Sequence, residues 1–212
     1  MVRIFQPETR SAALPALLWI HGGGYVLGDV ESDNLKAKGL ALALNCVVAS
    51  VEYRLAPEHP YPAPLEDCYA ALKWLSANAG QFGVNPQRIA IGGASAGGGL
   101  AAGLGLLARD RGEVPVCYQL LIYPMIDDSN VAQAAPDVPD APLWTRANNL
   151  IGWRSYLAQE PGGDGIPYYA APIRAEDVAG LPPTYIGVGT PDLFRDEDIA
   201  YAQRLMKAGV KT

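Results

Sequence analysis

One short segment combines residue types that suit nucleophilic catalysis. Gly93-Ala94-Ser95-Ala96-Gly97 has the pattern Gly-x-Ser-x-Gly, and it lies between an apolar β-branched run and an Ala/Leu-rich run. A serine on a tight turn between a strand and a helix presents its hydroxyl above a sheet, and small neighbours leave room for the turn. The order of strand, turn and helix therefore favours Ser95 as a nucleophile over the alternative, a serine that only caps the helix.

A second segment, His21-Gly22-Gly23-Gly24, follows the apolar run Ala16–Ile20. Consecutive glycines let the backbone approach a ligand and point successive N–H groups into one site. Such donors stabilise the oxyanion of an acyl-transfer intermediate, each by about 3 kcal/mol. We expect the amides of Gly23 and Gly24, with that of Ala96, to form an oxyanion hole. His21 and Gly22 are expected to support this loop.

The glycines after Ser95 also fit a dinucleotide-binding pattern, Gly-x-Gly-x-x-Ala, over Gly97–Ala102. That motif begins where its strand ends, whereas four residues separate Gly92 from Gly97 here. In addition, no acidic residue ends the next apolar run, Cys117–Ile122, to hold a ribose. The pattern therefore does not favour a dinucleotide cofactor.

Asp192 is the candidate acid. It follows the apolar run Thr184–Val188, at the edge where α/β sites assemble, and it comes after Ser95 in the chain. An Asp before a helix over Phe194–Met206 also suits an N-cap, and both roles are compatible. The acidic residues that follow are expected to form a solvated first helical turn: Asp196, Glu197 and Asp198.

The sequence holds two histidines, His21 and His59, and neither follows Ser95. A catalytic triad in this chain order is completed by a histidine after the acid. His59 lies in the proline-rich stretch Tyr53–Pro64, which we expect to be a fixed, extended loop far from the site. Because loss of the histidine costs serine hydrolases about six powers of ten in kcat, we expect the chain alone to be nearly inert.

Short apolar runs alternate with longer amphipathic ones along the chain, which predicts a doubly wound α/β domain with a mostly parallel sheet flanked by helices. The predicted strands are Val2–Phe5, Ala16–Ile20, Val47–Val51, Arg88–Ile91, Cys117–Ile122 and Thr184–Val188. The predicted helices are Asn34–Leu44, Leu65–Ala77, Ala96–Arg109, Ala147–Ala158 and Phe194–Met206.

We expect one domain over residues 1–212, with a long insertion at 127–180 that forms a partial cap or a pocket element. About sixty residues separate the last two predicted strands, and connections of that length are commonly functional.

Composition narrows the class of partner. The formal net charge of −6 gives no basic footprint for nucleic acid. Cys46, Cys68 and Cys117 are widely spaced, which disfavours a metal site and favours buried thiols in a reducing compartment. The N-terminus has no signal pattern and no run is long enough to span a membrane, so we expect a cytoplasmic protein. Oligomeric state, including a homo-oligomer, stays open.

Four motifs in order resemble the hormone-sensitive-lipase-like family of α/β-hydrolase carboxylesterases. They are His21–Gly24, Tyr53–Glu58, Gly93–Gly98 and Asp192–Asp196. The resemblance implies an α/β-hydrolase fold and hydrolysis of short-chain or aryl carboxylic esters through an acyl-serine, with no metal or cofactor and a small ester as partner. It identifies Ser95 as nucleophile, Gly23, Gly24 and Ala96 as the oxyanion hole, and Asp192 as the triad acid.

Compared with that family, two features differ. Many members carry Asp where this chain has Ala94. We also expect a core cut at both ends, without the N-terminal cap and the final strand with the catalytic histidine. The absent base motivates an alternative function, a catalytically silent ligand-binding module on the same fold.

Overall fold

A computed structural model describes residues 1–8, 13–130 and 144–212. Its centre is a six-stranded sheet with the order β1-β3-β2-β4-β5-β6. All neighbouring strands are parallel except β1, which runs antiparallel to β3. The strands are β1 (Val2–Phe5), β2 (Leu14–Ile20), β3 (Val47–Val51), β4 (Val84–Ala94), β5 (Tyr118–Ile122) and β6 (Thr184–Gly187).

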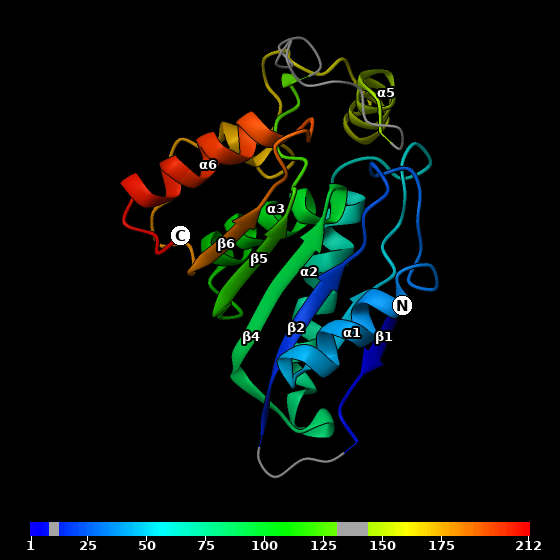
Figure 1. The fold of residues 1–212 in the computed structure, drawn as a ribbon, viewed down its shortest axis with the longest axis vertical. Helices are drawn as coiled ribbons and strands as arrows, with labels where there is room; N and C mark the ends of the chain where they lie inside the picture. The colour runs from blue at the N-terminus through cyan, green and yellow to red at the C-terminus, as the bar shows by residue number, and fades with distance from the viewer. Residues whose placement is uncertain (9–12, 131–143) are drawn as a thin grey trace.

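Helices follow most strands and cover both faces of the sheet. Figure 1 shows α1 on one face and α2 and α3 on the other. The α-helices are α1 (Asn34–Leu44), α2 (Ala63–Ala77), α3 (Ala96–Arg111), α5 (Arg146–Leu157) and α6 (Arg195–Lys207), and the 3₁₀ turns are η1 (Ala79–Phe82) and η2 (Pro172–Arg174). This arrangement confirms the predicted α/β architecture with a mostly parallel sheet.

The core divides into two clusters because side chains alternate along each strand. On β2, Leu18 and Ile20 belong to the larger cluster, which α2 and α3 cover, whereas Leu17 and Trp19 face the smaller cluster beneath α1. A strand buried on both faces needs apolar residues at every position. The continuous apolar runs of the sequence therefore predicted these strands well.

Many element boundaries differ from prediction, most of them by one or two residues, and the starts of β4 and α2 have clear physical reasons. Strand β4 begins at Val84 rather than Arg88, because the buried Val84 already pairs with Leu14, and the pairing register shifts before Ile89 pairs with Ala16. Helix α2 begins at Ala63, so Pro64 lies in its first turn instead of in the extended loop. Proline is tolerated there because the first amides of a helix have no intrahelical partner.

The strand register brings four chain segments to one edge of the sheet. Ile20 of β2 lies beside Gly93 of β4, and Ile122 of β5 lies between Ala94 and Gly187. The segments that leave the carboxyl ends of β2, β4, β5 and β6 therefore emerge together. Helix α5, from the long connection between β5 and β6, lies beyond this edge (Figure 1).

The cysteine prediction holds for two of three positions. Cys46 and Cys68 are buried free thiols, but Cys117 is exposed, because it lies just before β5, where the chain enters the sheet. Among the described residues, no helix is long and apolar enough to cross a membrane.

Candidate active site

Ser95 forms the whole turn between β4 and α3. Its backbone has φ 56° and ψ −124°, a conformation that costs a non-glycine residue about 1–3 kcal/mol. Neighbouring backbone groups hold it there. Its N–H donates to Ile122 O at 2.9 Å, and its carbonyl accepts from the N–H groups of Met125 and Gly99 at 3.0 Å each. The side chain remains partly exposed at the carboxyl edge of the sheet.

Glycines flank the turn because nothing larger fits. A Cβ atom on Gly93 would lie 2.2 Å from the carbonyl oxygen of Gly97. A Cβ atom on Gly97 would lie 2.1 Å from Ile20 O and 2.4 Å from His21 O. These are backbone contacts, so no side chain can move aside to relieve them. The Gly-x-Ser-x-Gly spacing thus lets the turn pack directly on the end of β2.

The glycine loop, residues 21–24, lies against Ser95. A Cβ on Gly22 would be 3.4 Å from Ser95 Cβ and 2.9 Å from Ala94 O. Gly23 and Gly24 have φ values of 119° and 59°, which glycine adopts readily. Gly23 and Gly24 lie in no helix or strand, and within the described parts of the chain no backbone carbonyl accepts a hydrogen bond from their N–H groups.

His21 is buried and supports this loop. Its Nδ1 donates to the carbonyl of Gly22 at 2.8 Å, and its ring stacks on Tyr53 with 4.3 Å between centroids. The hydroxyl of Tyr53 donates in turn to the carbonyl of His21 at 2.9 Å. Tyr53 thus fixes both the ring and the backbone of the residue that begins the loop.

Ser95 and Asp192 line one cavity of about 360 Å³. The sheet edge therefore brings together the two side chains that the sequence separates by almost half the chain. The other lining residues are mostly apolar or aromatic: Tyr123, Trp144, Gly189, Pro191, Leu193 and Phe194.

Asp192 is half-buried beside this cavity. Burial raises the pKa of its carboxyl group, and a hydrogen bond from Phe194 N–H at 2.9 Å partly offsets the effect. The N-cap of α6 is Phe194, with no side-chain cap, so Asp192 precedes the helix rather than capping it. A cationic partner placed next to a partly buried carboxylate stabilises its charged form.

The prediction of a solvated acidic turn after Asp192 is wrong for two of its three residues. Glu197 is 7% exposed and Asp198 is fully buried. The carboxylate of Glu197 accepts from the backbone N–H groups of Ile126 and Asp127 at 2.9 and 3.1 Å. The segment after β5 covers this turn of α6, and that contact has no local sequence signal.

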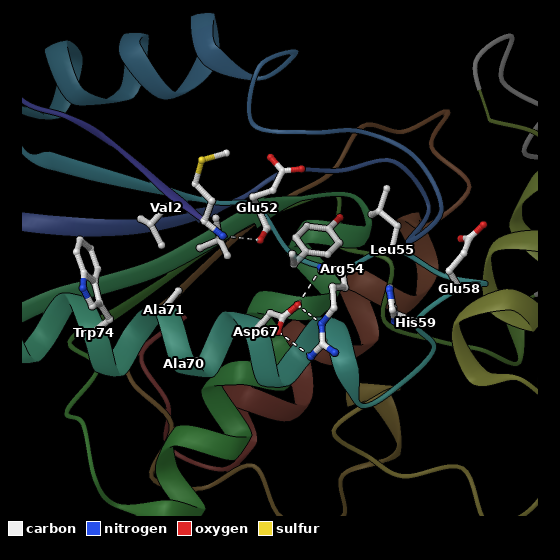
Figure 2. A pocket seen from close by; sticks show the side chains of 13 residues that line it. Val2, Glu52, Arg54, Leu55, Glu58, His59, Asp67, Ala70, Ala71 and Trp74 are labelled. Carbon is white, nitrogen blue, oxygen red and sulfur yellow. Dashed lines mark hydrogen bonds and ion pairs between the residues drawn. The ribbon is translucent and has the colours of Figure 1, made fainter.

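His59 lies on a different cavity, of about 840 Å³, which shares no lining residue with the Ser95 cavity. Figure 2 shows the exposed His59 beside the ion pair in which the Arg54 guanidinium donates twice to the Asp67 carboxylate, at 2.8 Å each. His59 is therefore separate from the Ser95 site, as its place in the proline-rich loop predicted.

Sequence reasoning missed Trp144. Its indole lines the Ser95 cavity and touches Gly24, where an added Cβ would lie 1.9 Å from Trp144 Cη2. No motif surrounds Trp144, and the one available signal is its place just before the N-cap Thr145 of α5. Among the described residues, no cluster of three His, Cys, Asp or Glu side chains is placed to hold a metal.

Comparison with known proteins places this geometry in a family. A family described as "alpha/beta hydrolase fold" matches residues 17–212. The carboxylesterase NlhH of Mycobacterium tuberculosis (strain CDC 1551 / Oshkosh) is 39% identical over 99% of this chain and 66% of its own length. An arylesterase of Saccharolobus solfataricus is 33% identical over 100% and 68%, respectively. The solved structure titled "Bacterial Heroin Esterase" has a TM-score of 0.94 and 47% identity, over 99% of this chain and 67% of its own.

The fold and the Ser95 site thus define an α/β-hydrolase. The chain belongs to the hormone-sensitive-lipase-like family of α/β-hydrolase carboxylesterases. It spans 66% of the length of the curated carboxylesterase that it matches.

Proposed function

We propose that this chain carries the nucleophile, the acid and the oxyanion donors of a serine esterase. The observation that carries the proposal is the cavity in which Ser95, on its strained turn, and Asp192 both lie, next to the glycine loop. Strain at a functional residue is retained when the surrounding structure enforces it, and here three backbone hydrogen bonds do so.

The proposed reaction has two steps. Ser95 Oγ attacks the ester carbonyl, an Oγ–C bond forms, and the serine proton passes to a general base. The N–H groups of Gly23, Gly24 and Ala96 hold the negative oxygen of the tetrahedral intermediate. The alcohol then leaves with a proton, and water hydrolyses the acyl-serine to the carboxylic acid. The role of Asp192 is to orient the base and to stabilise its protonated form.

Short-chain or aryl carboxylic esters are the proposed substrates. The cavity of about 360 Å³ is lined by the aromatic side chains of Tyr123, Trp144 and Phe194, which suits a small acyl or aromatic group. The names of the carboxylesterase and arylesterase relatives support the same class.

We propose further that the 212-residue chain alone lacks the proton acceptor. His21 is buried behind the glycine loop, and His59 lies on a separate cavity. An external base should then restore reactivity, since a general base contributes about 10²–10⁴-fold to such reactions.

The test is covalent labelling of the 212-residue protein by a p-nitrophenyl phosphonate ester, with and without added imidazole. The Ser95 Oγ–P bond forms, nitrophenolate leaves, and imidazole takes the serine proton. We expect a single adduct on Ser95, formed more than about tenfold faster with imidazole. Ser95→Ala should abolish the adduct, and Asp192→Asn should weaken the acceleration. An adduct that persists in Ser95→Ala contradicts the proposal.

A second function is favoured by the position of the two histidines: binding of a small acid or ester without turnover. It predicts saturable binding of a carboxylic acid with no labelling of Ser95 under any concentration of imidazole. The same labelling experiment therefore separates the two functions.

A further inference from the structure

The glycine loop meets an element from far along the chain. Gly24, at the end of the loop, is covered by the indole of Trp144, which directly precedes the N-cap residue Thr145 of α5. A Cβ on Gly24 would lie 1.9, 2.5 and 2.8 Å from Cη2, Cζ2 and Cζ3 of that indole. All three atoms belong to the six-membered ring, so one edge of the indole lies directly on the Gly24 backbone.

Two residues of α5 fix the indole in this place. The Nε1–H of Trp144 donates to Asn149 Oδ1 at 3.3 Å, and Asn149 is fully buried. Gly152 lies one turn further along α5. A Cβ there would be 3.3 Å from Trp144 Cζ2 and 2.7 Å from the carbonyl oxygen of Gly24. Because Gly152 has no side chain, both the indole of Trp144 and the carbonyl of Gly24 can pack against α5 at this position.

Tyr25, the residue that follows the glycine loop, is also held by α5. The ring of Tyr25 stacks on Tyr156 with 4.1 Å between centroids and lies 5.3 Å from Trp153. Its hydroxyl donates to Met125 O at 2.7 Å, on the segment that also bonds Ser95. Tyr25 is fully buried, so the residue after Gly24 cannot shift without disturbing the core.

The carbonyl of Gly24 shares its peptide plane with the N–H of Tyr25, whereas the Gly24 N–H lies in the preceding plane. The direction of the Gly24 N–H therefore follows from the fixed carbonyl only if φ and ψ of Gly24 are restrained as well. Gly24 alone would adopt many conformations, because glycine is unrestricted. Packing from α5 supplies the missing restraint. An oxyanion donor must be preorganised to be effective, and a displacement of about 1 Å costs roughly 10²-fold in rate.

We propose that Trp144 and Gly152 are positioning residues for the oxyanion donor of Gly24, and that α5 serves the reaction by holding this loop. The inference rests on the proposed function of Ser95. It assigns to a helix of the long β5–β6 connection a part in transition-state stabilisation, distinct from lining the cavity.

The test compares Gly152→Ala and Trp144→Ala with Ile151→Ala, a matched control on the exposed face of α5. Each variant is labelled with the phosphonate ester in imidazole, and the maximal rate constant and the half-saturating concentration are measured separately. Gly152 does not line the Ser95 cavity, so the substitution adds no atom to the cavity lining, and the half-saturating concentration reports any effect on binding through Trp144. We expect Gly152→Ala to lower the maximal rate constant about 10- to 100-fold with little change in half-saturation, and Trp144→Ala to lower it similarly. Ile151→Ala should behave as wild type.

Thermal melting of each variant separates positioning from unfolding, because the rate is compared only well below each midpoint. If Gly152→Ala and Trp144→Ala label at the wild-type maximal rate, or if only half-saturation changes, the inference is wrong. Absence of Ser95 labelling in the wild-type protein would instead overturn the proposed function itself.

Discussion

Asp198 should destabilise the fold at neutral pH, and replacing its carboxyl group should raise the free energy of unfolding measurably. The side chain is fully buried, and neither carboxyl oxygen has a hydrogen-bond partner within the described chain. Burial, with the nearby Glu197 and Asp192 carboxyls, raises the pKa of Asp198 to about 10. The folded protein therefore keeps Asp198 protonated, whereas the unfolded chain ionises it above about pH 4.

The sign of the effect follows from this difference. The contribution of Asp198 to stability is fully present below about pH 4 and is lost as the pH rises toward 10. Each pH unit in that window lowers the free energy of unfolding by about 1.4 kcal/mol, so about 4 kcal/mol is lost between pH 4 and 7. Asparagine has nearly the same shape and does not titrate. We therefore expect Asp198→Asn to be more stable than wild type at pH 7 by about 2–4 kcal/mol, the lower figure allowing for an unpaired buried amide.

Urea unfolding followed by circular dichroism at about pH 5, 7 and 8.5 measures the effect, with the exposed Asp164→Asn as control. The advantage of Asp198→Asn should grow with pH, and the control should stay within about 0.5 kcal/mol of wild type. A variant that is less stable than wild type at pH 7, with an unchanged pH dependence, refutes the reasoning.

Three further substitutions test the packing and the buried charges of the fold. Gly97→Ala should destabilise by about 1–3 kcal/mol or more in thermal melts, because its Cβ would lie 2.1 Å from Ile20 O. Gly39→Ala, with no atom within 4 Å and a helical backbone, should instead stabilise by about 0.5–1 kcal/mol, and a loss there would contradict the packing argument. Arg174→Met should cost about 3–5 kcal/mol in urea unfolding, because it leaves the fully buried Asp128 carboxylate without the guanidinium that donates to it at 2.5 and 2.8 Å. A loss of stability under about 1 kcal/mol would show that water screens this ion pair as it does a pair on the surface.

Local sequence patterns predicted the helices and strands because a strand that is buried on both faces of the sheet needs a continuous run of apolar residues. Strand β3 and helix α1 have the expected bounds. Strand β3 is a continuous apolar run, and helix α1 ends at Leu44 because the C-cap residue Asn45 adopts the left-handed conformation. The start of β4 left no such trace, because residues 85–88, which follow the buried Val84, are exposed or half-buried.

The site was predictable where chemistry depends on neighbours in sequence and not where it depends on distant contacts. The glycine spacing around Ser95 follows from local sterics. By contrast, no local pattern identifies Glu197 as buried, because its amide partner Ile126 lies 71 residues earlier in the chain. Trp144 has no local signal for the same reason, since its contact with Gly24 joins residues that are 120 positions apart in the chain (144 − 24).

The aromatic and glycine contacts of α5 also bear on protein engineering. Exchanging the β5–β6 connection between related hydrolases is a natural way to build hybrid enzymes. In this chain the connection cannot be exchanged on its own, because Gly152 packs against the backbone of Gly24 and Tyr156 stacks on the ring of Tyr25. A working chimera must therefore transplant both sides of that contact, near the start of the chain as well as in its middle.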